Sequence, residues 1–201
     1  MLDWASHESD RRAARGTAAD EVIMMSESLL KLTQFVSIML YVLVAGVMWG
    51  TWLSLARTMT EYDAETFLAD GQHMIANLAT VMEVLMISAL IVGLVVVVLL
   101  FAARSAVAGW LALAALLLMI AVLVITLAVE VPIDELIVTW TAETLPPDWQ
   151  EIRARWAAFH TLRTFGSLGA VAAAVAAGLT LRTVSRVRPQ LPATQVDHSS
   201  V

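Results

Sequence analysis

Four long runs of apolar residues, each without a charged side chain, dominate this chain. They are Phe35–Leu55, Val84–Ala103, Ala106–Val129 and Thr164–Leu181. Each run is long enough, as a helix, to cross a bilayer core of about 30 Å. A membrane β-barrel needs strands that alternate apolar and polar residues, and the run Val92–Phe101 shows no alternation. We therefore predict an all-α protein, an integral membrane four-helix bundle.

Composition indicates a single membrane domain. Hydrophobic residues make up 59% of the 201 residues and charged residues 15%, which leaves too little apolar sequence for a separate soluble core. We expect a cytosolic tail with an interfacial helix, the four-helix membrane domain and a disordered cytosolic tail, at 1–31, 32–183 and 184–201. The four spans are expected at approximately 34–56, 76–103, 106–130 and 158–182.

Several classes of function are excluded by residue content. The chain has no cysteine, which removes disulfides, thiolate nucleophiles and thiolate metal sites. Its net charge is −6 and its twelve Lys and Arg are scattered, so no nucleic-acid partner is expected. The expected partners are membrane lipid and a lipophilic small-molecule substrate. A homodimer through the glycine-rich faces of the first and fourth spans stays open.

Basic residues set the expected orientation. Eight of the twelve Lys and Arg lie before the first span, between the second and third spans, or after the fourth, and four lie on the other side. This bias places both termini in the cytoplasm, with the protein in the cytoplasmic (inner) membrane as a multi-pass protein. The two long loops would then face outward.

A ring of polar residues lies at the outward ends of the spans. Two acids and two bases fall at one height, namely Arg57, Glu83, Glu130 and Arg163, and further out come His73, Asn77, Trp156 and His160. Their helical spacing places His73 with Asn77 on one face, and His160 with Arg163 on another. Such residues often serve only as anchors at the headgroups, but both signs of charge from several helices also suit a site.

Prolines mark two boundaries near this ring. Pro132 follows Glu130 and predicts a kink or a stop in the third span, from which Asp134 can fold back over the bundle. Pro146-Pro147-Asp148 predicts the start of the last helix well outside the membrane. That amphipathic helix would lead through Trp156 into the fourth span.

The stretch Glu130-Val-Pro-Ile-Asp134, followed by Arg155-Trp156-Ala-Ala-Phe-His160-Thr-Leu-Arg163, resembles the paired signature of the anthrone oxygenase-like family, a domain-of-unknown-function group of four-span proteins. The family pattern is Asn-x-Pro-x-Asn, then Trp-x-x-x-Asn-x-x-Arg. This chain keeps Pro132, Trp156 and Arg163 and carries Glu130, Asp134 and His160 in place of the asparagines. The resemblance covers about residues 40 to 180.

The resemblance implies a compact four-helix membrane fold, in a family where some fungal members oxidise anthrones to anthraquinones with molecular oxygen. We expect His160 as general base, Glu130 or Asp134 to orient it, and Arg163 to stabilise an enolate oxygen. The expected substrate-binding residues are His73, Asn77, Trp156, Glu83 and Arg57.

Two alternatives stay open. A metal such as zinc, manganese or iron could lie among Glu130, Asp134, His160 and His73, but no tight ligand spacing supports it, so the sequence requires no cofactor. The other alternative is a non-catalytic membrane scaffold or partner subunit, in which the outer ion pairs only hold the helices together. Whether the protein is an enzyme, a possible oxygenase or oxidoreductase, is undecided by the sequence.

Overall fold

The structure, a computed structural model, describes residues 3–181, with side chains from residue 25 onward. It is helical, and residues 3–181 contain no strand. The long helices are α1 (Asp3–Thr51), α2 (Ala64–Ala102), α3 (Ala106–Ile125) and α5 (Trp149–Thr180), and α4 (Val131–Ile137) is short. The predicted all-α class is confirmed. The predicted tail 184–201 lies outside the described residues.

Four helical stretches are long and apolar enough to cross a membrane, as the sequence predicts. They are Met25–Glu61, Ala64–Ala102, Ala106–Ile137 and Trp149–Thr180. The chain therefore has the features of a multi-pass membrane protein. α1 runs from Asp3 without a break, so it also covers the residues expected to form a tail and an interfacial helix.

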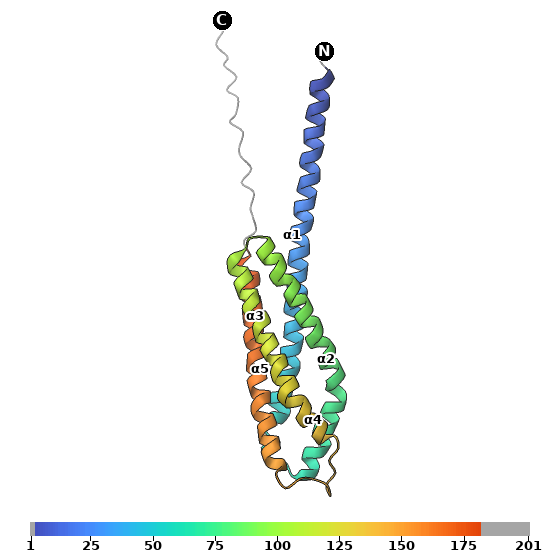
Figure 1. The fold of residues 1–201 in the computed structure, drawn as a ribbon, viewed down its shortest axis with the longest axis vertical. Helices are drawn as coiled ribbons and strands as arrows, with labels where there is room; N and C mark the ends of the chain where they lie inside the picture. The colour runs from blue at the N-terminus through green and yellow to red at the C-terminus, as the bar shows by residue number, and fades with distance from the viewer. Residues whose placement is uncertain (1–2, 182–201) are drawn as a thin grey trace.

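The four long helices lie side by side (Figure 1). α1 and α3 each contact both α2 and α5, so the helices close into a ring. We call the end with the tight α2–α3 turn at Ala103–Ser105 the turn end. The other end, with the connections 57–63 and 138–148, is the loop end. α1 extends past the turn end as a single projecting helix (Figure 1).

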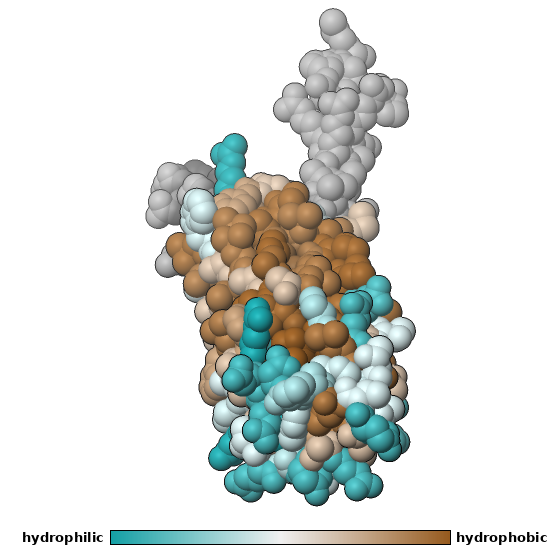
Figure 2. Space-filling view, turned by 60° about the horizontal axis from the view of Figure 1, so that its bottom comes forward, coloured by the Kyte–Doolittle hydropathy of each residue, from teal (hydrophilic) through white to brown (hydrophobic). Residues whose placement is uncertain are grey.

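Large apolar side chains cover the outside of the helices. Val84 and Ile91 on α2 are each 60% exposed, and Leu127 is 59% exposed. In Figure 2, hydrophilic residues gather at the loop end and hydrophobic residues cover the sides beyond it. Such a surface is expected where lipid, rather than water, surrounds the helices.

Two π-helical turns interrupt the regular helices near the loop end. One, Trp52–Ala56, ends α1, and the other, Thr126–Glu130, joins α3 to α4. Pro132 follows the second turn and lies in the first turn of α4. Because a π-turn widens the hydrogen-bond ladder, it accommodates a proline that cannot donate. The chain therefore continues as helix past Pro132, and Glu130 faces inward, fully buried.

Both helices that enter from the loop end begin at clear signals. The carboxylate of Asp63 accepts a hydrogen bond of 2.8 Å from the backbone N–H of Thr66 and caps α2. This bond lowers the pKa of the Asp63 carboxyl group. α5 begins at Trp149, directly after the prolines that predict its start.

Arg153 fastens the first connection to α5. Its guanidinium donates to the backbone oxygens of Tyr62 at 2.9 Å and Thr60 at 3.1 Å. The same group lies over the ring of Trp149, 4.6 Å from its centroid. One buried arginine therefore holds the segment 57–63 against the helix that carries most of the polar cluster described next.

Candidate functional site

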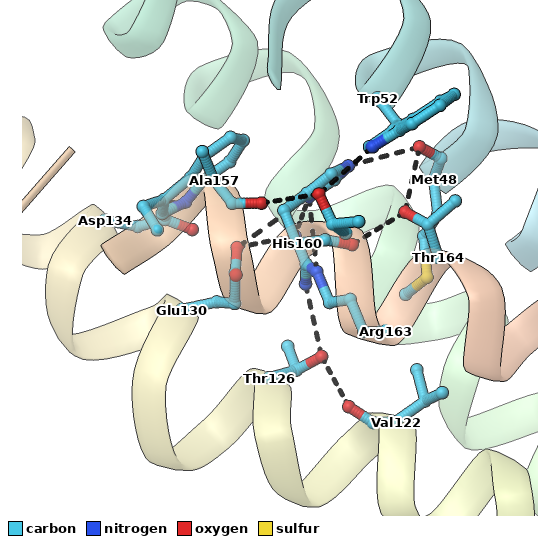
Figure 3. Close-up of polar contacts among 12 residues, drawn as sticks. Met48, Trp52, Val122, Thr126, Glu130, Asp134, Ala157, His160, Arg163 and Thr164 are labelled. Carbon is cyan, nitrogen blue, oxygen red and sulfur yellow. Dashed lines mark hydrogen bonds and ion pairs between the residues drawn. The ribbon is translucent and has the colours of Figure 1, made fainter. Parts of the chain in front are cut away.

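A group of three charged or polar side chains, of which two are buried and Arg163 is partly buried, lies inside the loop end (Figure 3). Nη2 of Arg163 is 2.8 Å from Oε2 of Glu130 and 2.9 Å from Nδ1 of His160. Nε of Arg163 also donates to Nδ1 of His160, at 3.3 Å. Glu130 comes from the π-helical turn, and the other two residues lie one turn apart on α5.

The contacts of His160 define its protonation. Because Arg163 can only donate, Nδ1 of His160 must accept and therefore carries no proton. The proton is then on Nε2, which donates to the backbone oxygen of Met48 at 3.1 Å. The 3.9 Å approach of Nδ1 to Oε2 of Glu130 is thus no ion pair. His160 is neutral, and both of its nitrogens are occupied.

Glu130 is held at a cost in free energy. The residue is fully buried, and Oε1 has no hydrogen-bond partner. Oε2 lies close to the Arg163 guanidinium, but the contact lacks hydrogen-bond alignment, so we describe it as an ion pair. A buried carboxylate with so few partners destabilises a fold unless the opposite charge stays beside it. Arg163 supplies that charge.

Asp134 is the second carboxylate of the group. It lies on α4, one turn after Glu130, and Oδ1 accepts a hydrogen bond of 2.9 Å from Nε1 of Trp156. The Trp156 ring in turn stacks on the His160 ring, with centroids 4.7 Å apart. Oδ2 of Asp134 makes no hydrogen bond within residues 25–181. Asp134 therefore has one oxygen fixed and one free.

A cavity of about 510 Å³ lies beside these residues. All five helices contribute to its wall, which is mostly apolar, and its polar lining residues are Thr51, Thr80, Glu83, Thr126, Asp134, His160 and Arg163. A cavity of this size and lining suits a largely apolar small molecule with a few polar groups. Glu130 lies behind the wall and acts on the cavity only through Arg163.

The four residues predicted as catalytic, His160, Arg163, Glu130 and Asp134, are brought together. The other predicted site residues are spread more widely. Trp156 is buried against His160, and Glu83 lines the cavity from α2 without an ion pair to Arg57 or Arg163 among the described residues.

Three predicted binding residues lie outside the cavity lining. His73 and Asn77 are exposed on α2, and Nδ1 of His73 contacts the backbone oxygen of Ala69, one turn earlier. Arg57 is exposed and lies 5.2 Å from the ring centroid of Trp52. The shared helix face of His73 and Asn77 thus points away from the cavity.

Sequence reasoning missed three groups that position the cluster. Thr126 accepts a hydrogen bond of 3.2 Å from Nη1 of Arg163, and its spacing of four before Glu130 was a usable signal. The hydroxyl of Thr164 donates to the backbone oxygen of His160 at 2.7 Å. The Met48 carbonyl could not have been found, because a backbone oxygen carries no residue-type signal.

The sequence leaves open a metal site among Glu130, Asp134, His160 and His73. Over residues 25–181, no three His, Asp or Glu side chains converge in a way that could hold a metal ion. His73 is exposed on α2, and the carboxylate of Glu130 faces a guanidinium. The arrangement that is present suits an ion pair.

Comparison with known proteins gives one match. The sequence model of the family described as Anthrone oxygenase matches residues 76–178, just over half of the chain. The matched segment contains Glu83, Glu130, Asp134, His160 and Arg163. No curated protein and no solved structure matches the chain significantly.

Proposed function

Starting from the fact that this chain belongs to the anthrone oxygenase family, we propose that it oxidises a lipophilic aromatic substrate of the anthrone type in the loop-end cavity. One observation carries the proposal. Asp134 and Arg163 line the same apolar cavity, the first with a free carboxylate oxygen and the second with a guanidinium. A base and a fixed cation beside one apolar cavity suit removal of a proton next to a carbonyl group.

The overall reaction needs only dioxygen as oxidant. The base takes one proton from the methylene carbon of the anthrone, which leaves an enolate. The enolate transfers electrons to dioxygen and forms a C–O bond, and a proton returns to give a hydroperoxide. Loss of water from the hydroperoxide then yields the quinone carbonyl, so that one methylene and one dioxygen give one carbonyl and one water.

Asp134 takes the role of the base in this proposal. The sequence favoured His160, but its Nδ1 faces Arg163 and its Nε2 faces the Met48 carbonyl. His160 is therefore a positioning residue that fixes the guanidinium. Asp134 has an oxygen free for a proton, and its other oxygen is held by Trp156.

Arg163 stabilises the enolate oxygen. A guanidinium has five N–H groups, and here two point to His160 and one to Thr126, while Nη2 also forms the ion pair with Glu130. One N–H on Nη1 remains for a substrate oxygen. Because the guanidinium is already fixed by its other contacts, it would not need to reorganise as negative charge develops.

The protein is proposed to lie in the cytoplasmic membrane with both termini in the cytoplasm and the loop end outside. The support is the bias of Lys and Arg described above. Because the chain has no cysteine, single cysteines at Ala142 and Ser105 can be labelled in intact cells with a membrane-impermeant maleimide. Labelling of position 142 alone is expected, and labelling of position 105 alone would reverse the orientation.

Purified protein should accelerate oxygen uptake and quinone absorbance from an anthrone, above the spontaneous oxidation in buffer. Ala79 and Ala76 are both exposed on α2, but only Ala79 lines the cavity. Ala79→Trp should therefore remove the acceleration and Ala76→Trp should retain it. An absence of acceleration in the wild type, or equal loss in both variants, would reject the proposal.

The scaffold alternative has one observation in its favour. The Arg163–Glu130 ion pair joins α5 to the segment between α3 and α4, so it could serve only to hold helices together. On this alternative, replacing Arg163 by Glu and Glu130 by Arg together would restore stability, and no anthrone would be turned over.

A further inference from the structure

The cavity opens sideways, between α2 and the segment that joins α3 to α4. Residues that both line the cavity and are exposed mark the mouth, and on α2 these include Glu83 and Ile87. On the opposite side of the mouth, Leu127 lines the cavity and is 59% exposed. The mouth is therefore on the flank of the helices.

Apolar side chains surround this mouth. Val84 and Ile91 on α2 are each 60% exposed, and Val124 on α3 is 57% exposed. The sequence carries no charged residue from Val84 to Ala103. These residues place the mouth beside the apolar flank of α2 and α3, so a ligand would reach it from lipid. Figure 2 shows the apolar sides of the molecule beyond the hydrophilic loop end.

Negative charge dominates the cavity wall. Its titratable residues are Glu83, Asp134, His160 and Arg163. His160 is neutral, and the charge of Arg163 is offset by Glu130 at 2.8 Å. The carboxylates of Glu83 and Asp134 have no cation within salt-bridge distance among the described residues. An anion entering the cavity would therefore meet uncompensated negative charge, in surroundings that screen it less than water does.

Glu83 is the first titratable residue of the cavity wall that an entering molecule would contact. It lies at the mouth and makes no hydrogen bond or ion pair within residues 25–181. A carboxylate in this state accepts hydrogen bonds from a hydroxyl group and repels a second carboxylate.

We infer that Glu83 is a specificity-determining residue at a lipid-facing mouth. It selects lipophilic aromatic molecules that carry a phenolic hydroxyl and rejects those that carry a carboxylate. The inference deepens the proposed function, on which its choice of ring system rests, but the selection itself is a property of binding. It can therefore be measured without turnover.

Two anthraquinones make a matched pair of probes, because they differ only at position 2 and are not oxidised further. One carries a hydroxyl and the other a carboxylate, and at mildly acidic pH only the carboxylate is ionised. Binding to detergent-purified protein is followed by quenching of tryptophan fluorescence. We expect the wild type to bind the hydroxyl compound about tenfold more tightly, in line with a charge-assisted hydrogen bond on one side and repulsion on the other.

Three variants test the source of that preference. Glu83→Gln keeps a hydrogen-bond acceptor without charge, so affinity for the carboxylate should rise about fivefold, and affinity for the phenol should fall about twofold because the hydrogen bond is no longer charge-assisted. Glu83→Ala should weaken phenol binding about tenfold, through loss of the acceptor. Glu65→Gln is the control, because Glu65 is exposed on α2 outside the cavity lining, and both affinities should stay at the wild-type value.

The inference is overturned if the wild type binds neither quinone, binds both equally, or keeps its preference in Glu83→Gln. Its failure is distinct from failure of the proposed function. If the preference for the hydroxyl compound depends on Glu83 but no anthrone is turned over, the inference stands and the proposed oxygenase function is rejected. Anthrone turnover together with unchanged quinone affinities in Glu83→Gln would support the oxygenase and reject the role of Glu83 in selection.

Discussion

The two ends of the helical bundle differ in the residues that fill their interiors. At the turn end the buried core is mostly aliphatic, with side chains such as Leu100, Ala108, Ala112 and Ala177. At the loop end the interior holds a carboxylate, a guanidinium and an imidazole beside a cavity. Both ends lie in one set of four helices, so helix packing does not require the second arrangement.

This difference distinguishes the features that stabilise the fold from those that we assign to function. A cavity and a buried carboxylate with a free oxygen both lower stability, and at the turn end the same helices pack without a buried carboxylate among the described residues. Features that are retained at a cost in stability tend to serve function. We therefore place function at the loop end, and the following predictions test this division.

The largest expected effect comes from Arg163→Met. The substitution leaves the carboxylate of Glu130 buried without a compensating charge, because no other cation contacts it among the described residues. The free energy of unfolding should fall by about 3–5 kcal/mol, the usual cost of breaking one side of a buried ion pair. Unfolding in a titration with a denaturing detergent would measure it.

The double variant Glu130→Gln with Arg163→Met is the matching control. It removes both charges, so most of the lost stability should return. If the single variant is as stable as the wild type, Glu130 is not held by Arg163. If the double variant is as unstable as the single, the charge of Glu130 is not the cause.

A smaller loss is expected for Arg153→Met. The change removes two hydrogen bonds from a charged group to the Thr60 and Tyr62 carbonyls, and should cost about 2 kcal/mol. Proteolysis within 57–63 should also become faster. Arg155 is exposed on the same helix, and Arg155→Met should change stability by less than about 0.5 kcal/mol. Equal effects of the two substitutions would show that Arg153 does not fasten this connection.

A change in the aliphatic part of the bundle should lower stability without changing activity per folded molecule. A Cβ at Gly93 would collide with the hydroxyl of buried Tyr41, so Gly93→Ala should cost about 1–2 kcal/mol. Adding Tyr41→Phe should relieve the collision. At Gly46 a Cβ would meet nothing within 4 Å, so Gly46→Ala is the control and should not destabilise. Lost activity in folded Gly93→Ala protein would weaken the division between the ends.

The smallest effect is expected at Gln34, a buried polar residue away from the cavity. Nε2 donates to the Ala174 carbonyl at 3.0 Å, but Oε1 has no partner. Gln34→Met removes the favourable bond and the unsatisfied oxygen together, so stability should change by less than about 1 kcal/mol. Thermal unfolding followed by circular dichroism would show it. A large loss would mean that this amide supports the fold more than its contacts indicate.

Much of the fold could be predicted, because the hydrophobic runs and the prolines are local signals. The start of α5 follows from Pro146-Pro147-Asp148, and the four membrane-crossing helices follow from the apolar runs. The π-helical turns at Trp52–Ala56 and Thr126–Glu130 could not be predicted, since they depend on how the neighbouring helices pack. Pro132 predicts a kink or a stop, and the stop is wrong, because the chain continues as helix through α4 to Ile137.

The site could be predicted as a group of residues but not as a set of roles. Helical spacing and the family signature bring His160, Arg163 and Glu130 together. Glu83 and Glu130 lie at the same height in the sequence reading, so only the structure could show which acid pairs with Arg163. The role of His160 changed because one of its partners is a backbone carbonyl.

The most direct test of the account measures two properties of Asp134→Asn in the same preparation, namely the rate of dioxygen uptake with an anthrone and the melting temperature. The asparagine can still accept the hydrogen bond from Trp156 but cannot take a proton. We predict a rate at least about 100-fold lower with an unchanged melting temperature. A wild-type rate, or a rate that falls only as far as the folded fraction falls, would contradict the assignment of function to the loop-end cavity.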